Sequence, residues 1–276
     1  QINFFSMEKI PASVVEALNT PFEVSPSQVA FFRENGFIKI KNVFSKEVID
    51  FMSEAITREV NRLNKQRLSM EERDTYGKAF LQIMNIWRNS EVVKEIVFGK
   101  RLAQMATRLL EVKGVRMYHD QALYKEAGGV HTPWHADQYY WPLNTDKTIT
   151  AWIPLQETPL PLGPLEFSAG SYQLTEGRDK EISDESQAFL ESVLKKSGFG
   201  HIIEPFDLGE VSFHKGWTYH RAGPNQSTQM RKVMTIIYMD KDIRLKAPEN
   251  KNQQADWDTW CPNVKIGEVV DSPLNP

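Results

Sequence analysis

The sequence has very little cysteine: Cys261 is the single cysteine in 276 residues. One thiol cannot form a disulfide within the chain, which fits a protein from a reducing compartment. We therefore interpret Cys261 as a structural thiol. The first residues also lack the basic start and apolar run of a secretory signal. These features together favour an intracellular, cytoplasmic protein.

Long apolar runs and a charge excess of one sign are absent as well. No stretch of 18 apolar residues occurs, so we expect no membrane span and a soluble protein. The formal net charge is −3, from 33 basic and 36 acidic residues that are interspersed. Without an extended basic field, binding to nucleic acid is not expected. The sequence leaves the oligomeric state open.

The residues that are present suit one sizeable core. Hydrophobic residues make up 41% of the chain and aromatic residues 11%, and single β-rich domains of this length are common. The N-terminal part reads as helical after an irregular lead-in over residues 1–24. Its three helical patterns are a helix that begins at Ser25-Pro26 and ends at Gly36, a helix from Ser45 to about residue 64, and a helix over 92–110 interrupted at Gly99.

After residue 114 the sequence pattern changes from one typical of helices to one typical of strands. We expect strands at 115–125, 148–155, 163–167, 201–206, 210–214 and 231–240, one helix near 184–196, and a tail from 241 that wraps the surface. Helices followed by short strands favour a β-sandwich or jelly roll, mainly β, supported by N-terminal helices. The predicted organisation is one domain over 1–276, with helical support in 1–114, a jelly-roll core in 115–240 and a tail in 241–276.

Two segments carry candidate metal ligands. His135 and Asp137 lie two residues apart in 131–141, so a strand there would direct both side chains to one face. His220 is the candidate third ligand. Two histidines and one carboxylate leave the opposite side of a metal open, an arrangement typical of non-haem Fe(II) oxygenases. Zn(II) accepts the same ligand set in hydrolases, and the spacing alone leaves both metals open.

The sequence around these candidate ligands resembles the phytanoyl-CoA dioxygenase family of Fe(II)/2-oxoglutarate-dependent oxygenases. The similarity runs from about residue 115 to 240. The matching residues are His135-Ala136-Asp137, Trp152, Gly163-Pro164-Leu165, Ala169-Gly170-Ser171, Gly209-Glu210-Val211, His220, Gly223-Pro224-Asn225 and Arg231, with a tail match at 272–276. The resemblance implies a double-stranded β-helix, which is a cupin-like jelly roll.

The resemblance also implies the chemistry. Fe(II) is expected at His135, Asp137 and His220, which would be the catalytic set, with 2-oxoglutarate as co-substrate and O2 as oxidant. Arg231 is expected to bind the distal carboxylate of 2-oxoglutarate, because a guanidinium matches a carboxylate in a bidentate way. The implied reaction hydroxylates an unactivated C–H bond of a small-molecule substrate and releases succinate and CO2. Asp137 disfavours halogenation, because related halogenases have a small residue at that position.

Further residues are candidates for contacts with the co-substrate or the substrate. The co-substrate candidates are Trp152, Thr150, Met117 and Gln82; the substrate candidates are Gln121, Tyr139, Trp141 and Trp217. If Met117 faces inward, strand alternation places His119 and Gln121 on the same side. The sequence departs from the family at Tyr172, where a histidine is usual, and at Ala222, where a serine occurs.

Other interpretations remain open at this point. His131, His201 and His214 are read as structural rather than as ligands, although His214 lies six residues before His220. A zinc hydrolase or cupin-type isomerase would keep the metal without the redox chemistry. A catalytically silent jelly-roll binding protein would keep the fold alone.

Overall fold

Residues 9–276 are described by a computed structural model. Six of their eight α-helices begin where a side chain supplies a capping oxygen, and the two that start at Ala12 and Lys100 begin without one. The Ser25 hydroxyl accepts a hydrogen bond from the backbone N–H of Gln28, whose side chain in turn accepts one from the N–H of Ser25. Gly36 ends this helix with φ 76°, a conformation that glycine adopts without strain. Ser45 caps the next helix. The α-helices are α1 Ala12–Asn19, α2 Pro26–Asn35, α3 Lys46–Leu63, α4 Thr75–Ala79, α5 Glu91–Val97, α6 Lys100–Leu110, α7 Asp184–Ser197 and α8 Lys251–Trp260.

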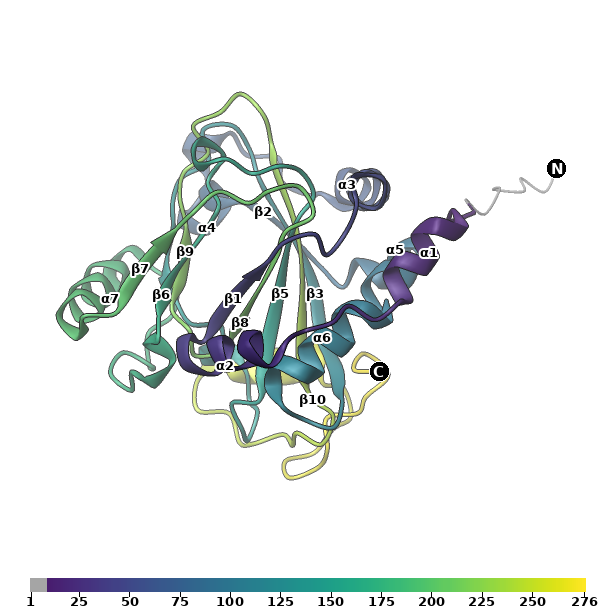
Figure 1. Cartoon of the computed structure of the whole chain (residues 1–276). Helices are drawn as coiled ribbons and strands as arrows, with labels where there is room; N and C mark the ends of the chain where they lie inside the picture. Colours follow the sequence, from purple (N-terminus) through teal and green to yellow (C-terminus); the bar gives the residue numbers. More distant parts are fainter. Residues whose placement is uncertain (1–8) are drawn as a thin grey trace.

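The strands form two antiparallel sheets (Figure 1). The six-stranded sheet has the order β1-β8-β5-β10-β3-β2 and the four-stranded sheet the order β4-β9-β6-β7. The strands are β1 Phe37–Ile40, β2 Leu81–Met84, β3 Val115–Lys125, β4 Thr132–His135, β5 Thr148–Pro154, β6 Leu165–Ala169, β7 Gly200–Ile203, β8 Val211–Lys215, β9 His220–Ala222 and β10 Arg231–Asp240. Five short 3-10 turns occur between these elements in the described residues: η1 Met70–Glu72, η2 Ile86–Asn89, η3 Asp137–Tyr140, η4 Leu160–Leu162 and η5 Ser171–Gln173.

Helices cover one face of the six-stranded sheet (Figure 1). On α6 the apolar side chains of Leu102, Met105, Ala106 and Leu109 recur every three or four residues and are buried against β5, β10 and β3. Each fully buried leucine or methionine side chain stabilises the fold by about 1.5–3 kcal/mol. This face of the sheet is therefore the main core, and it is closed to ligands.

The other face of the same sheet looks toward the four-stranded sheet. Alternate residues of β3, β5 and β10 point to this side, because successive side chains of a strand face opposite ways. A cavity of about 350 Å³ lies here, lined by residues of both sheets. The two-sheet arrangement confirms the jelly-roll prediction. "Mainly β" holds only roughly, since 37% of the described residues are helical and 24% lie in strands.

Three local expectations were wrong. The lead-in contains α1, whose Val14 and Leu18, four residues apart, are buried in the main core; residues 1–8 lie outside the described part. The tail contains α8, which begins at an Asn250 cap rather than simply wrapping the surface. The segment with the first two candidate ligands is a strand only as far as His135, and Asp137 begins the 3-10 turn η3.

No helix in residues 9–276 has the length and apolar character needed to cross a membrane. The division of one domain into 1–114, 115–240 and 241–276 stays a prediction.

Candidate metal centre

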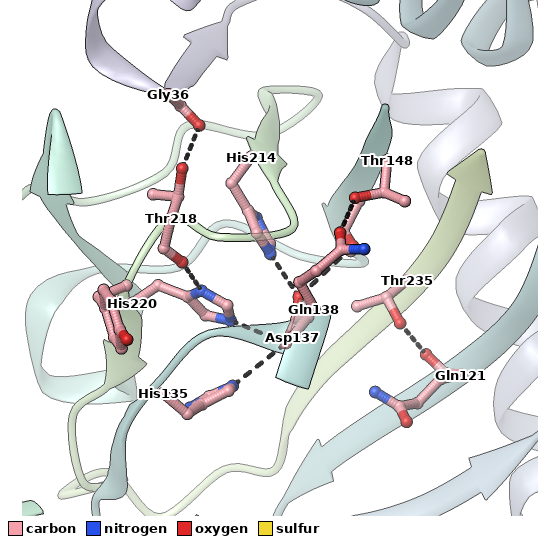
Figure 2. Close-up of polar contacts among 12 residues, drawn as sticks. Gly36, Gln121, His135, Asp137, Gln138, Thr148, His214, Thr218, His220 and Thr235 are labelled. Carbon is pink, nitrogen blue, oxygen red and sulfur yellow. Dashed lines mark hydrogen bonds and ion pairs between the residues drawn. The ribbon is translucent and has the colours of Figure 1, made fainter. Parts of the chain in front are cut away.

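Strand pairing brings the two candidate histidine ligands face to face. His135 ends β4, His220 begins β9, and these antiparallel strands place the two residues directly opposite each other. Their ring centroids lie 4.2 Å apart. Asp137 follows in η3, and its Oδ1 lies 3.4 Å from Nε2 of each histidine (Figure 2). Gln138 fixes this turn, because its backbone N–H donates to the carbonyl of Gly216 at 2.9 Å.

Backbone carbonyls decide which nitrogen of each imidazole is free. Nδ1 of His135 lies 2.7 Å from the carbonyl oxygen of Pro133, and Nδ1 of His220 lies 2.9 Å from that of Thr218. A carbonyl can only accept, so each Nδ1 carries the hydrogen and each Nε2 keeps its lone pair. Both lone pairs point toward Oδ1 of Asp137. The ligand atoms of the three residues lie within 4.8 Å of one another, which fits one metal ion.

Burial and charge keep these groups in the forms that bind metal. Burial lowers the pKa of His135, and the neighbouring His220 lowers it further, so its ring is neutral. Burial alone would raise the pKa of Asp137, but the hydrogen bond that His214 donates favours the ionised carboxylate, and the pKa of this carboxyl lies well below its usual range. A neutral imidazole and an ionised carboxylate are the ligand forms that metals require.

His214, read from the sequence as structural, reaches the same carboxylate from β8. Its Nε2 donates to Oδ2 of Asp137 at 3.0 Å (Figure 2). The Thr150 hydroxyl donates to the same oxygen at 3.5 Å. Oδ2 is therefore held, and Oδ1 is left to face His135 and His220. Nδ1 of His214 is buried without a hydrogen-bond partner among the described residues. The ring thus acts on the candidate ligand Asp137 and does not join the candidate ligand set.

Arg231 lies at the buried inner end of the cavity, and its charge has no counter-ion there. Its side chain is 1% exposed, Nη1 donates to the carbonyl of Gly163 at 2.8 Å, and its guanidinium lies 5.4 Å from the Trp152 ring centroid. Nε has no partner, and no carboxylate of residues 9–276 forms an ion pair with it. Burial lowers the pKa of Arg231 to about 9. A buried cation without a partner is costly, so the site fits a ligand carboxylate.

Several other predicted residues line the same cavity. Thr150 and Trp152 point into it from one face of β5, and Trp141, Gln82 and Gln121 line it as well. Nε2 of Gln82 donates to Oε1 of Gln121 at 2.6 Å, so the amides form a pair in the cavity wall.

Met117 does not reach the cavity, because β3 contains a bulge. Ile237 of β10 pairs with His119, whereas the next residue, Tyr238, pairs with Met117, which leaves Tyr118 without a partner. The extra residue reverses the alternation, and Met117 packs into the helix-covered core. His119 and Gln121 keep their place in the cavity wall. The prediction that Met117 contacts the co-substrate is therefore wrong, because its side chain lies on the helix-covered side of the sheet.

Tyr139 and Trp217, expected near the substrate, also lie outside the cavity wall. The Tyr139 hydroxyl accepts a hydrogen bond from Asn252 at 3.2 Å, and its carbonyl accepts one from Gln253 at 3.0 Å, so this residue holds α8. Trp217 packs beneath the guanidinium of Arg178, 4.4 Å from the ring centroid. Both aromatic residues therefore make structural contacts in place of the predicted contacts with substrate.

Sequence reasoning missed the wall that α8 contributes. Asn252, Asp256 and Trp260 all line the cavity, and they are spaced by four residues, which places them on one face of a helix. This spacing, together with the Asn250 cap, was the available signal. Glu181 and Ile182, from the connection between η5 and α7, complete that wall.

A jelly roll that sets two histidines and a carboxylate beside a separate place for a second carboxylate is the architecture of Fe(II)/2-oxoglutarate-dependent dioxygenases, and the protein is of that class. The chain belongs to the phytanoyl-CoA dioxygenase (PhyH) family, whose model matches residues 32–233. The resemblance noted in the sequence is thereby confirmed.

Individual relatives are distant in sequence. A probable alpha-ketoglutarate-dependent hypophosphite dioxygenase of Stutzerimonas stutzeri is 21% identical over 230 residues, which cover 76% of this chain and 77% of the relative. Among solved structures, the alpha-ketoglutarate-dependent carbocyclase SnoK from nogalamycin biosynthesis has a TM-score of 0.74 at 22% identity, covering 93% of this chain and 98% of SnoK. EctD from S. alaskensis, solved with 2-oxoglutarate and 5-hydroxyectoine, has a TM-score of 0.64 at 20% identity, covering 82% of this chain and 79% of EctD. These structural similarities establish the fold.

Proposed function

We propose that the protein hydroxylates an unactivated C–H bond of a small molecule, using Fe(II), 2-oxoglutarate and O2 and releasing succinate and CO2. His135, Asp137 and His220 would hold the iron, and Arg231 would bind the distal carboxylate of 2-oxoglutarate. The unpaired buried guanidinium of Arg231, in the cavity that also contains the His–Asp–His set, is the observation that carries this proposal. A zinc hydrolase on the same three ligands would have no use for that cation.

The chemistry that the bound iron and 2-oxoglutarate supply is the oxidation of a C–H bond coupled to decarboxylation of the keto acid. The chain contributes binding, orientation and exclusion of water. Arg231 neutralises a carboxylate in a place from which bulk water is excluded, and Trp152 lies beside it. His214 and Thr150 fix Oδ2 of Asp137, so that Oδ1 faces the two imidazoles.

The substrate and the location are part of the same proposal. A cavity of about 350 Å³ supports a small molecule rather than a macromolecule. A cytoplasmic location is supported by the buried free thiol of Cys261.

Binding of the co-substrate tests this function directly. The purified protein, loaded anaerobically with Fe(II), is expected to develop a weak visible charge-transfer band when 2-oxoglutarate is added. Arg231→Ala should require at least about tenfold more 2-oxoglutarate to reach the same band, because a buried charge-assisted contact is lost.

Arg108→Ala is a matched control, since Arg108 is an exposed arginine on α6 outside the cavity. The proposal is wrong if folded wild-type protein binds Fe(II) but shows no band with 2-oxoglutarate. Equal 2-oxoglutarate affinity in Arg231→Ala and Arg108→Ala would refute the role given to Arg231.

A further inference from the structure

The cavity has two chemically different ends. At the inner end, Arg231, Trp152 and Leu165 are all buried. The outer end is formed by His119, Tyr140, Glu181, Asn252, Asp256 and Trp260. Of these six residues, Glu181 is exposed and Tyr140, Asn252, Asp256 and Trp260 are half-buried. A substrate that enters from solvent therefore meets this outer end first, and Arg231 lies six residues along β10 from Ile237, the strand partner of His119.

Apart from the Tyr140 hydroxyl, which accepts from the N–H of Ile182 at 3.0 Å, the polar groups of the outer end are hydrogen-bond acceptors. Asp256 receives one hydrogen bond, from the Tyr118 hydroxyl to Oδ2 at 2.7 Å, and Oδ1 has no partner among the described residues. The amide nitrogen of Asn252 donates to Oε2 of Glu181 at 3.1 Å and to the Tyr139 hydroxyl at 3.2 Å. Both of its hydrogens are then used, and the amide presents its oxygen to the cavity.

His119 adds a third acceptor, and it is buried. Its side chain is 4% exposed and lines the cavity. Nδ1 lies 3.0 Å from the carbonyl oxygen of Asp120, so Nδ1 carries the hydrogen and Nε2 keeps the lone pair. Nε2 has no hydrogen-bond partner in residues 9–276. Three acceptors without matching donors, on Asp256, Asn252 and His119, call for a ligand that donates.

The charges and the aromatic rings of the outer end also favour a ligand that donates hydrogen bonds. Glu181 and Asp256 bring two carboxylates to the outer end, and among the described lining residues no lysine or arginine accompanies them; Arg231 lies at the opposite end. The rings of Trp260 and Tyr140 line the same end. Aromatic faces attract cations electrostatically, as carboxylates do. An anionic substrate would meet repulsion here.

We propose that the outer end of the cavity binds a protonated amine of the substrate, with Asp256 and Glu181 as counter-ions and Trp260 and Tyr140 as flanking rings. The proposal rests on the hydroxylase function above and names the class of its substrate: a compact organic ammonium ion that presents a C–H bond to the metal centre. It sets aside anionic substrates, including coenzyme A esters, whose phosphates would face both carboxylates.

The desolvation of Asp256 supports this assignment. Burial raises the pKa of its carboxyl to about 7, which reflects a charge without a cation beside it. An ammonium ion at Oδ1 would supply that cation and would favour the ionised form of Asp256.

Three probes of the same ring size test the proposal: cyclohexylamine, cyclohexanol and cyclohexanecarboxylate. Their binding is followed by tryptophan fluorescence, to which Trp260 and Trp141 in the cavity wall contribute, with protein loaded anaerobically with Fe(II) and 2-oxoglutarate. The amine should bind at least about tenfold more tightly than the alcohol, and the carboxylate more weakly than both. Asp256→Asn and Glu181→Gln should each remove most of the preference for the amine.

Asp258→Asn is the matched control, because Asp258 lies two residues further on α8 on its exposed side and should leave amine binding unchanged. Equal binding of amine and alcohol would overturn the proposal in favour of a neutral, hydroxylated substrate. Tighter binding of the carboxylate, or wild-type amine affinity in both cavity variants, would also overturn it. The charge-transfer band in the same samples reports separately on the hydroxylase function, so failure of one is distinguishable from failure of the other.

Discussion

At the scale of single residues, the candidate centre depends on side chains that are not ligands themselves. His214 holds one oxygen of Asp137, and backbone carbonyls hold Nδ1 of His135 and of His220. Such outer contacts orient a ligand and raise its affinity for metal. The three ligand candidates were readable from the sequence because each is a metal-binding residue type in a matching motif. The contact of His214 with Asp137 could not be predicted from the sequence, because only the fold brings β8 beside Asp137.

The first residue-scale prediction concerns His214 as a positioning residue. His214→Ala should weaken Fe(II) binding by about 10- to 100-fold, because Oδ2 of Asp137 is then no longer held by the imidazole. His214→Gln, which can still donate a hydrogen bond, should restore much of that affinity. Anaerobic Fe(II) titration measures both. If the two variants lose affinity equally, the hydrogen bond is not what matters.

A second residue-scale prediction concerns stability and pH. The pKa of Asp256 is about 7 in the folded protein, above its ordinary value of 3.8. The folded state therefore holds this proton more tightly than the unfolded chain, and the free energy of unfolding contributed by Asp256 falls as pH rises through that interval. Asp256→Asn keeps an acceptor for Tyr118 and removes the charge. Its melting temperature should exceed that of wild type by more at pH 8 than at pH 5. An identical difference at both pH values would contradict the assignment.

At the scale of elements, prediction succeeded where the signal is local. The bounds of β3 and β10 match those expected, as does the Ser45 start of α3, because strand alternation and caps are written in neighbouring residues. The bulge at Tyr118 and the contact of α8 with the cavity depend on distant partners. Asn275, for example, donates to the carbonyls of Met117 and Tyr118 at 3.2 Å, which fixes the bulge from the far end of the chain.

The connection between α2 and β1 yields an element-scale prediction. Gly36 has φ 76°, and a Cβ there would lie 2.5 Å from Oγ1 of Thr218, whose carbonyl holds His220. Gly36→Ala should destabilise the fold by more than the roughly 1–2 kcal/mol of a left-handed backbone, and it should also weaken Fe(II) binding. Denaturant unfolding and metal titration measure the two effects.

Gly198 provides the comparison for this variant. It also ends a helix, α7, with φ 72°, but nothing lies within 4 Å of an added Cβ. Gly198→Ala should therefore show the backbone cost alone and bind Fe(II) as wild type does. Similar losses of stability and of metal affinity in both variants would mean that crowding at Thr218 is unimportant.

At the scale of the whole molecule, the cavity leaves charge unpaired that ligands would neutralise. Fe(II) at about 100 times its dissociation constant should raise the free energy of unfolding by about 2.7 kcal/mol, and 2-oxoglutarate should add a further increment. Anaerobic thermal unfolding measures both. Asp137→Ala should remove the effect of the metal, whereas Arg231→Ala should retain it and lose the increment from 2-oxoglutarate. Retention of that increment in Arg231→Ala would contradict the anion site.

The part of the cavity wall that α8 forms lies in a different stretch of the chain from the candidate metal ligands. The family match ends at residue 233, and α8 begins at Lys251. The candidate metal ligands lie within the family match, whereas three residues of the proposed amine site, Asn252, Asp256 and Trp260, lie beyond it. A chimera that exchanged only α8, Lys251–Trp260, would therefore alter substrate preference and leave His135, Asp137 and His220 unchanged.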